Sequence, residues 1–421
     1  MRRILRAMIA TSLAGLACAP AALAADAPYD KHTLIVKYAD SASGRERLDT
    51  AAGAGVVKTL GTVTGFAARL VYVNGDPKDV ARRLNASPAV LYAEPNYIYR
   101  TQAIPNDARF GELWGLHNTG QSAGLADADI DAPEGWDLAG LTTGPGAWPA
   151  TGGVKVGLVD TGVQASHPDL QGKVADCAGV RSFGIKLLIL VLFADPTIVG
   201  GKCVDDNGHG THTAGTVAAR ANNAAGVAGV AFNSPLAICK ALDAQGAGTV
   251  AAVANCITYL NQRGAKIISM SLGGPGATTL ANAVAAASQN GSLLIGSAGN
   301  GGSATPNYPA AYPQVVSVAA VDRRGAHPAF STANADVELS APGVDVLSSW
   351  LGGGYFTASG TSMAAPHAAG VAALIAAKNP SGGPAAWRAT LGAAVDDLGA
   401  PGRDPQFGFG RVNLAKAVTA P

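Results

Sequence analysis

The feature that most constrains this chain is a regular alternation of short apolar runs with longer helix-compatible stretches across residues 154–378. The apolar runs, rich in Val, Ile, Leu and Ala, are Val154–Val159, Leu236–Leu242, Ile267–Leu272, Leu293–Ser297 and Val315–Val321. The helix-compatible stretches are Thr211–Ala221, Val250–Arg263, Leu280–Gln289 and Ser362–Lys378. This alternation predicts an α/β fold in which helices cover both faces of a parallel sheet. A site in such a sheet is expected at the carboxyl ends of the strands.

Residues 31–100 have a different pattern, which indicates a small α+β unit. The expected order is a strand at Thr33–Tyr38, a helix at Arg45–Ala54, strands at Gly65–Val73 and Val90–Tyr99, and a helix that Asp76 caps before Pro77. One more strand before Gly65 would complete a ferredoxin-like β-α-β-β-α-β unit. The polar segment Thr101–Asp107 would link it to the larger domain.

The N-terminus has the features of a secretory signal peptide. Arg2, Arg3 and Arg6 precede an apolar stretch, and Ala22-Leu23-Ala24 fits a signal-peptidase site. The apolar stretch is shorter than the ~20 residues of a membrane span. Cys18 raises a lipoprotein alternative, although the residues before it match that pattern poorly. We expect residues 1–24 to be removed, 25–103 to form the N-terminal unit and 104–421 the main domain, in a protein that is secreted or periplasmic.

The charge and the apolar runs bear on nucleic-acid binding and membrane insertion, and the cysteines bear on disulfide pairing. The formal charge of +1, from 30 basic and 29 acidic residues, gives no basis for nucleic-acid binding. Stable membrane insertion is not expected, and the apolar run 187–193 is also too short to span a bilayer. Four cysteines would remain after cleavage, and three pairings are possible. Proximity in sequence favours Cys177–Cys203 and Cys239–Cys256.

Three polar residues lie where strands end or helices begin, and together they could carry out acyl transfer. Asp160 follows the apolar run 156–159, His209 lies between two glycines before a helix, and Ser362 opens the last long helix. Each has an ordinary structural explanation alone, as a turn, a core histidine or an N-cap. Asn300, after another apolar strand, could supply an amide donor to an oxyanion. The four together favour catalysis.

The motifs around these residues resemble those of the subtilase family of serine proteases. The segments are Val-Asp-Thr-Gly-Val at 159–163, Gly-His-Gly-Thr-His at 208–212 and Gly-Thr-Ser-Met-Ala-Ala-Pro-His at 360–367. The chain order Asp, His, Ser is that of subtilisin. The resemblance runs from about Trp114 to Asn413, and residues 31–100 resemble the family's inhibitor-type propeptide.

The resemblance implies a role for each residue. Ser362 would attack the peptide carbonyl, His209 would transfer the proton and Asp160 would orient the imidazole. Asn300 and the Ser362 N–H would hold the oxyanion, whereas His212 and His367 would be structural. Catalysis would need no cofactor. The enzyme would be a monomer that cuts proteins or peptides, is made as a self-processing zymogen, and is inhibited by its own propeptide until cleavage between Tyr97 and Ala108.

Substrate-binding and calcium residues also follow from the resemblance. Ser271, Leu272 and Gly273 would pair with extended substrate, and Ala298, Gly299 and Asn307 would line the pocket for the residue before the cut. Residues 297–314 contain no Asp or Glu, which favours broad cleavage or an apolar or aromatic residue there. Residues 222–227 resemble the family's calcium loop, and the implied side-chain ligands are Gln121, Asp169 and Asn223.

The chain departs from the family pattern at residues 183–203, where an apolar run replaces a short polar approach to the histidine. We expect a surface insertion folded against a Cys177–Cys203 bridge. Other functions fit parts of the sequence. An α/β-hydrolase esterase would require Ser before Asp and His, which is not the order here. A non-catalytic exported binding protein is disfavoured by the complete set of residues, and a transpeptidase on the same scaffold would be revealed by a ligated product.

Overall fold

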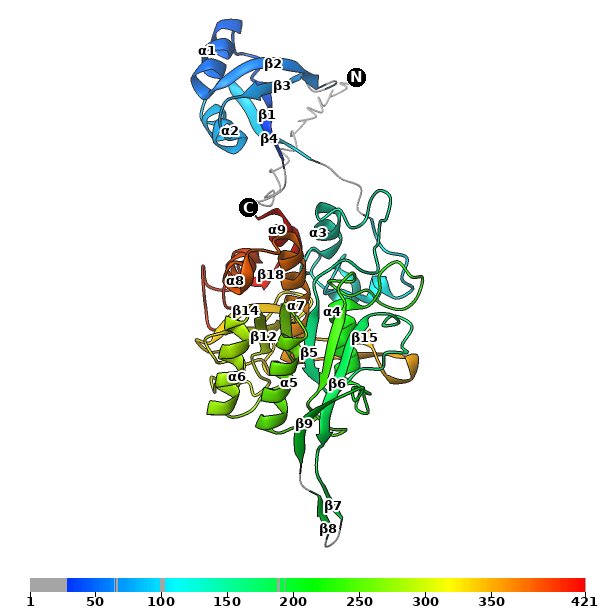
Figure 1. Cartoon of the computed structure of the whole chain (residues 1–421). Coiled ribbons are helices and arrows are strands. Elements are labelled where there is room, and N and C mark those ends of the chain that lie inside the picture. The colour runs from blue at the N-terminus through cyan, green and yellow to red at the C-terminus, as the bar shows by residue number, and fades with distance from the viewer. Residues whose placement is uncertain are drawn as a thin grey trace, which may run out of the picture. The chain divides into compact units, whose positions relative to one another are not determined.

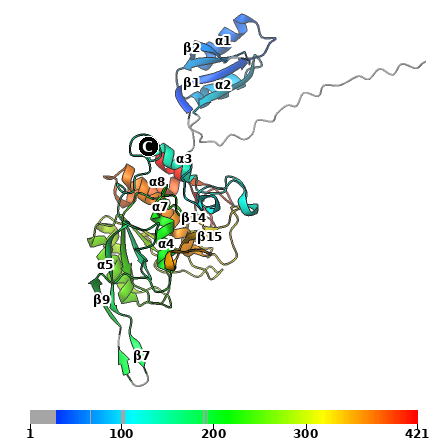
Figure 2. The ribbon, with the colours of Figure 1, turned by 90° about the vertical axis from the view of Figure 1, so that its right-hand side faces the viewer.

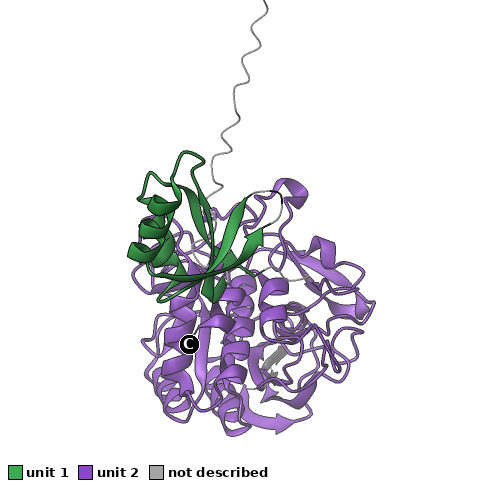
Figure 3. Cartoon of the chain, turned by 90° about the horizontal axis from the view of Figure 1, so that it is seen from above, with its two compact units in different colours: residues 1–101 green, residues 102–421 purple. Residues whose placement is uncertain are grey.

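The computed structural model describes residues 29–63, 65, 67–98, 103–187, 190–192 and 194–420. The chain divides into two compact units, residues 1–101 and 102–421 (Figure 3). The signal peptide expected over residues 1–24 lies outside the described residues.

The smaller unit has the expected β-α-β-β-α-β order. Its elements are β1 (Tyr29–Tyr38), α1 (Gly44–Ala54), β2 (Val56–Val63), β3 (Ala68–Val73), α2 (Pro77–Asn85) and β4 (Val90–Tyr97). The strands form an antiparallel sheet in the order β2-β3-β1-β4. Asp76 caps α2 by accepting a hydrogen bond from Lys78 N–H, and Pro77 occupies the first turn. Val80 and Leu84 of α2 are fully buried in this unit's own core.

The larger unit is built on a sheet of ten strands among the described residues, in the order β17-β18-β14-β13-β12-β11-β5-β10-β6-β9 (Figure 1). The strands are β5 (Val156–Asp160), β6 (Val174–Ser182), β9 (Asp195–Gly200), β10 (Leu236–Lys240), β11 (Ile267–Met270), β12 (Leu293–Ser297), β13 (Val315–Val321), β14 (Val337–Pro342), β17 (Val395–Asp396) and β18 (Arg411–Val412). The strands from β6 to β18 run parallel, whereas β9 pairs antiparallel with β6 and β17 pairs antiparallel with β18. The expected parallel sheet is therefore confirmed, with antiparallel strands at its edges.

Helices cover both faces of this sheet, and each face has its own core. Leu236 and Ile238 of β10 belong to the core that includes α4 (His209–Ala218) and α7 (Thr361–Lys378). Ala237 and Cys239 point to the other core, with α5 (Val250–Gln262) and α6 (Thr278–Gln289). Strands buried on both faces explain the unbroken apolar runs in the sequence. The remaining elements are α3 (Ala132–Leu138), α8 (Gly383–Ala393), α9 (Leu414–Thr419), β15 (Val346–Ser349) and β16 (Tyr355–Ala358), with short 3-10 turns at Phe110–Glu112, Gln121–Ala123 and Leu351–Gly353.

The segment that departs from the family pattern is a hairpin at the edge of the sheet. Strands β6 and β9 form its base, and it continues into the small antiparallel pair β7 (Ile185–Leu187) and β8 (Leu190–Leu192), which projects away from the sheet (Figure 2). Residues 188, 189 and 193 of the apolar run lie outside the described residues. A Cys177–Cys203 disulfide closes the base of the hairpin, and a Cys239–Cys256 disulfide joins β10 to α5. These are the two short loops favoured by the sequence.

Candidate active site

Asp160 is a buried carboxylate at the carboxyl end of β5. A carboxylate in that position is costly unless it is hydrogen-bonded. One of its oxygens accepts from Thr161 N–H at 2.7 Å, and the other accepts from the Thr213 hydroxyl at 3.1 Å. The first oxygen also lies 2.8 Å from Nδ1 of His209. The two residues that the sequence placed at separate element ends are therefore in direct contact.

His209 is the first residue of α4, and its side chain is 28% exposed. Its Nδ1 atom faces Asp160, so a proton on Nδ1 leaves Nε2 as the acceptor. Burial would lower the pKa of His209, but the charge of Asp160 and the hydrogen bond to it outweigh burial and raise the pKa above its ordinary value. The imidazole is thus oriented by a carboxylate and can accept a proton on its other nitrogen.

Glycine on both sides of His209 permits close approach of neighbouring groups. A Cβ atom on Gly208 would lie 2.5 Å from the Trp350 ring, and this residue also has a positive φ of 108°. A Cβ atom on Gly210 would lie 2.2 Å from the carbonyl oxygen of Gly162. A larger residue at position 208 would clash with Trp350 and one at position 210 with Gly162, so either would displace the first turn of α4, which carries His209.

Asp205 is a positioning group that the sequence analysis missed. It is buried, and its carboxylate accepts hydrogen bonds from the Thr161 hydroxyl, from the N–H groups of Asn207, Gly208 and Thr211, and from the Thr211 hydroxyl. Burial would raise the pKa of Asp205, but these hydrogen bonds lower it. The carboxylate ties the turn before His209 to the end of β5. The signal in the sequence is an Asp two residues before Asn207-Gly208, which is typical of an Asx turn.

Ser362 is the second residue of α7, and two contacts with Ser271 position it. The Ser362 carbonyl accepts from the Ser271 hydroxyl at 2.8 Å, and the Ser362 hydroxyl donates to the Ser271 carbonyl at 3.3 Å. Pro366 lies four residues on in the same helix and has no N–H, so the Ser362 carbonyl is free for this contact. Within the described part of the chain, no hydrogen bond joins Ser362 to His209.

Asn300 contacts the first turn of α7 through its side chain. Its oxygen accepts from the N–H and the hydroxyl of Thr361, at 2.8 and 2.9 Å. A Cβ atom on Gly360 would lie 3.3 Å from Asn300 Nδ2 and 3.7 Å from the Ser362 N atom. The side-chain nitrogen of Asn300 and the main-chain nitrogen of Ser362 therefore both lie beside Gly360, at the start of α7. This geometry could stabilise a negatively charged oxygen.

The residues expected to bind substrate lie together beside this space. A Cβ atom on Gly273 would lie 2.1 Å from Asn307 Oδ1, and one on Gly299 would lie 3.1 Å from Asn307 Cβ. Asn307 Nδ2 donates to the Ser297 carbonyl, and the Ser297 hydroxyl donates to the Leu272 carbonyl. Asn307 therefore lies between the segments 271–273 and 297–299, and its side-chain amide contacts both of them. Ala298 is buried there, where its N–H donates to Val318.

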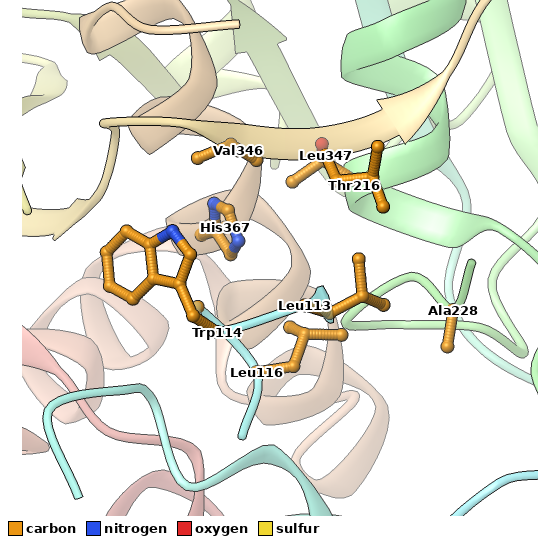
Figure 4. Close-up of a pocket in the computed structure, with 9 residues that line it drawn as sticks. Leu113, Trp114, Leu116, Thr216, Ala228, Val346, Leu347 and His367 are labelled. Atoms are coloured by element: carbon orange, nitrogen blue, oxygen red, sulfur yellow. The ribbon is translucent and has the colours of Figure 1, made fainter. Parts of the chain in front are cut away.

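The two other histidines near the motifs are buried and neutral. His212 Nε2 lies 3.1 Å from the carbonyl oxygens of both Val346 and Phe356, and burial lowers the pKa of His212 to about 4. Burial also lowers the pKa of His367 to about 4, and its Nδ1 lies 2.8 Å from the Met363 carbonyl. The His367 ring borders a cavity of about 10 Å³ beside Trp114 (Figure 4). Both rings contact core groups, in line with a structural role.

A pair of buried aspartates faces the loop 222–227. Asp169 accepts from Asn223 Nδ2 at 3.1 Å and from Val227 N–H at 3.0 Å. Asp107 accepts from Asn222 N–H at 2.6 Å. Burial, with a smaller contribution from the charge of Asp169, raises the pKa of Asp107 to about 6. Asp107 was not among the residues predicted from the sequence.

Gln121 occupies a different environment from the one that the resemblance implied. Its side-chain oxygen accepts from Thr119 N–H at 2.7 Å, and its nitrogen donates to the His117 carbonyl at 2.8 Å and the Gly111 carbonyl at 3.4 Å. These contacts connect Gln121 to the main chain of Thr119, His117 and Gly111. Among the described residues, Gln121 has no hydrogen bond to Asp169 or to the loop 222–227. The side chains of Asn106 and Asp107 reach this loop from the N-terminal part of the unit, and that of Asp107 is the carboxylate.

Comparison with known proteins identifies the class to which this fold and site belong. Residues 151–410 match the Subtilase family of peptidases, and residues 17–96 match the fervidolysin N-terminal prodomain. The chain belongs to the subtilase family. It is a serine endopeptidase that acts on protein substrates and carries an N-terminal prodomain.

Several relatives are similar over most of their length. Thermitase from Thermoactinomyces vulgaris is 41% identical over 290 residues, which is 69% of this chain and 93% of thermitase. The thermophilic serine proteinase of Bacillus sp. (strain AK1) is 37% identical over 347 residues, or 82% of this chain and 77% of the relative. Among solved structures, sphericase superposes with a TM-score of 0.56 at 34% identity and covers 66% of this chain and 97% of sphericase. None of the helices among the described residues has the length and apolar character of a membrane span.

Proposed function

We propose that this protein is a secreted serine endopeptidase that uses Asp160, His209 and Ser362 as its catalytic triad. The observation that carries the proposal is the 2.8 Å contact between Asp160 and His209. In the same unit, the main-chain nitrogen of Ser362 and Asn300 Nδ2 both lie within 4 Å of the position that a Cβ atom on Gly360 would occupy. A non-catalytic binding protein would have no need for an imidazole that a buried carboxylate orients.

The chemistry follows from these positions. Rotation of the Ser362 side chain away from the Ser271 carbonyl would bring its hydroxyl to His209 Nε2, a contact that often forms only once substrate binds. His209 would take the hydroxyl proton as Ser362 Oγ attacks the peptide carbonyl, and would then give the proton to the departing amine. Asp160 would fix the tautomer and stabilise the imidazolium. Water would release the acyl group by the same steps in reverse. No cofactor takes part in these steps.

Asn300→Ala is expected to lower kcat about 10²–10³-fold with little change in KM, which is the size of the loss when the corresponding amide donor is removed from subtilisin. The reason is that Asn300 Nδ2 would donate only to the oxygen that becomes negative in the transition state. Steady-state kinetics on a peptide substrate measure both constants. Asn290→Ala, which removes an exposed amide at the end of α6, is the matched control. An equal loss in the control, or a change confined to KM, would remove Asn300 from the oxyanion site.

Specificity, processing and export belong to the same proposal. With no Asp or Glu in residues 297–314 and an amide, Asn307, wedged beside Gly273, the pocket suits apolar or aromatic residues or broad cleavage. The prodomain would inhibit the enzyme until cleavage between Tyr97 and Ala108. The N-terminal residues 1–24 would direct export and be removed, and two disulfides suit an oxidising compartment.

A serine-directed fluorophosphonate label tests the proposal directly. The mature enzyme should be labelled at one residue, and tandem mass spectrometry of the digest should place the label on Ser362. Heat-unfolded enzyme should take up no label, because the reaction requires the assembled site. Absence of labelling in a folded, processed sample would favour a binding protein over an enzyme.

We also propose a structural calcium ion held by Asp107, Asp169, Asn223 and backbone carbonyls of the loop 222–227. The donor set fits, because Ca²⁺ prefers carboxylate and carbonyl oxygens. Burial, and to a smaller extent the charge of Asp169, raises the pKa of Asp107. A bound cation would stabilise the ionised form of this carboxylate. Asn222 and Ala224 have positive φ angles of 59° and 60°, so the loop is tightly coiled.

Chelation with EDTA is expected to lower the thermal midpoint by about 5 °C, because a ligand that binds only the folded state stabilises it by mass action. Asp107→Asn should abolish this shift. Gln121→Ala, the control, should retain it, because among the described residues the Gln121 amide bonds to Thr119, His117 and Gly111 and not to the loop 222–227. Differential scanning calorimetry with and without added calcium gives the measurement. Retention of the shift in Asp107→Asn with loss in Gln121→Ala would restore Gln121 as the ligand.

A further inference from the structure

The first described residues of the larger unit, 103–107, form a short segment that contacts within this unit hold in place. Pro105 is buried. Asn106 N–H donates to Asn222 Oδ1 at 3.1 Å, and Asn106 Oδ1 accepts from Ala224 N–H at 2.8 Å. Asp107 is buried and accepts from Asn222 N–H at 2.6 Å. The carboxyl end of the segment is therefore attached to the loop 222–227, which limits where its first residue can lie.

The main-chain nitrogen of Ala103 contacts a carboxylate. Its N–H donates to one carboxylate oxygen of Asp137 at 3.3 Å, and the hydroxyl of Thr142 donates to the other oxygen. Asp137 lies in α3 next to Trp136, which is fully buried and whose indole donates to the Val230 carbonyl at 2.8 Å. The carboxylate is thus held on a well-anchored helix, and the two donors described for it are both neutral groups.

The position of Asp137 in its helix favours a positive charge nearby. It is the sixth of the seven residues of α3, and the last turn, Gly-Trp-Asp-Leu, contains no basic residue. The carboxyl end of a helix carries a partial negative charge, so a carboxylate there is disfavoured and a cation is favoured. The atom that already lies against this carboxylate is the nitrogen of Ala103.

Hydrolysis of the peptide bond before Ala103 would change the charge of this nitrogen. The hydroxyl group of water joins the carbonyl carbon of residue 102, the carbon–nitrogen bond breaks, and both water protons end on the nitrogen, which leaves a carboxylate and an ammonium group. An amide N–H is one neutral donor, whereas an ammonium group has three donors and a full charge. Charge-assisted hydrogen bonds are shorter and roughly twice as strong as neutral ones. The same contact with Asp137 would therefore become an ion pair.

We propose that the processed enzyme begins at Ala103 and that Asp137, with Thr142, binds the ammonium group that processing creates. The inference rests on the proposed function and selects one bond within the range proposed for the processing cut. The ion pair exists only after the cut, so the processed enzyme has a stabilising contact that the zymogen lacks. It also fixes the amino end of the segment that carries Asp107, the carboxylate proposed for calcium.

N-terminal sequencing of the processed wild-type enzyme gives the first test. The residues read should be Ala-Ile-Pro-Asn-Asp, from Ala103 onward. A start at any other residue would place the new ammonium group elsewhere and would overturn the proposal. A wild-type protein that neither processes itself nor digests casein would refute the proposed function instead, and the second test does not depend on that activity.

The second test creates the ammonium group with another protease. In a Ser362→Ala zymogen, residues 99–102 are replaced by the recognition sequence of a site-specific protease that cuts directly before Ala103. The thermal midpoint of the larger unit is measured before and after this cut, with Asp137 intact and as Asp137→Asn, and comparison of the two versions cancels the effect of prodomain release. At pH 6.5 the substitution should lower the midpoint by about 3 °C more after the cut than before it, as expected for one partly buried ion pair.

The pH dependence of this shift separates an ion pair from a structural role for Asp137. An α-amino group has an ordinary pKa of about 7.7–8.0, and a nearby carboxylate raises the pKa of such a group in the folded protein. The stabilisation is therefore complete below about pH 7.5 and is lost as the pH rises through the raised pKa. The extra shift should be absent at about pH 10.5. An effect of Asp137→Asn that is equal before and after the cut, or that persists at the higher pH, would overturn the proposal.

Two controls accompany the pH series. Glu112→Gln removes a carboxylate from an exposed ion pair with Arg109, which does not depend on the cut, so its effect should be the same in both forms. A zymogen whose cut leaves two glycines before Ala103 keeps Asp137 but moves the ammonium group away from it. After the cut this form should melt about 3 °C below the form that begins at Ala103, even if Asp137→Asn folds poorly. Equal midpoints with and without the two glycines would overturn the proposal.

Discussion

Ser362→Ala is expected to abolish peptide hydrolysis and to leave the prodomain attached. The substitution removes the only atom proposed to form the covalent acyl intermediate, and it leaves the Ser362 carbonyl, which accepts from Ser271, in place. Loss of the catalytic serine or histidine of subtilisin lowers kcat about 2 × 10⁶-fold, and we expect an effect of similar size here. If the enzyme processes itself, the same loss stops removal of the N-terminal unit.

Intact-mass spectrometry beside a casein digest measures both consequences. Wild-type protein should lose its prodomain and digest casein, whereas Ser362→Ala should retain residues 25–103 and leave casein intact. Ser359→Ala, three residues upstream and exposed, is the matched control and should behave as wild type. Addition of a trace of mature wild-type enzyme to the Ser362→Ala zymogen then separates self-cleavage from cleavage by another molecule. Normal processing of Ser362→Ala during expression, before any wild-type enzyme is added, would show that a different protease matures the chain.

The central strands could be predicted from the sequence because burial on both faces produces unbroken apolar runs. Strands β5 and β10 to β13 lie within two residues of their predicted ends. Strand β14 was missed because its sequence, VELSAP, contains a charge and a proline. Glu338 is tolerated there since Arg388, fifty residues later in α8, pairs with it. Because Arg388 is distant in sequence from Glu338, no local sequence pattern could predict this ion pair.

The difference between local patterns and distant partners also explains which site residues could be predicted. Asp160, His209, Ser362 and Asn300 lie in local motifs at element ends, and the sequence alone predicts a site at the carboxyl ends of the strands. Asp205 was not predicted because its contact with Thr161 joins residues that are 44 positions apart. Asp107 escaped for the same reason, since its partner Asn222 lies 115 residues away. Gln121 has the right chemistry for a calcium ligand, but its amide is already hydrogen-bonded to Thr119, His117 and Gly111.

Asp160→Asn is expected to lower kcat by about four orders of magnitude, as loss of the triad carboxylate does in serine proteases. An asparagine can donate to Nδ1 and so favours the tautomer in which Nε2 carries the proton and cannot accept one. The change also removes the charge that raises the pKa of His209. The base must be neutral to act, so activity falls as pH drops through this pKa. The residual activity of the variant should therefore lose its acid limb at a lower pH than the wild type.

The pH profile of kcat/KM, measured on one peptide substrate, distinguishes this role from a structural one. A merely destabilised enzyme would lose amplitude without moving the midpoint of the acid limb, and its thermal midpoint would fall. Asp206→Asn is the matched control, because it makes the same chemical change three residues before His209 on a carboxylate that is half exposed and bonded to Lys240 instead. We expect it to change kcat by only a few-fold and to keep the wild-type acid limb. An acid limb that stays in place in Asp160→Asn would mean that the carboxylate does not set the pKa of the base, and that the 2.8 Å contact positions the imidazole without tuning it.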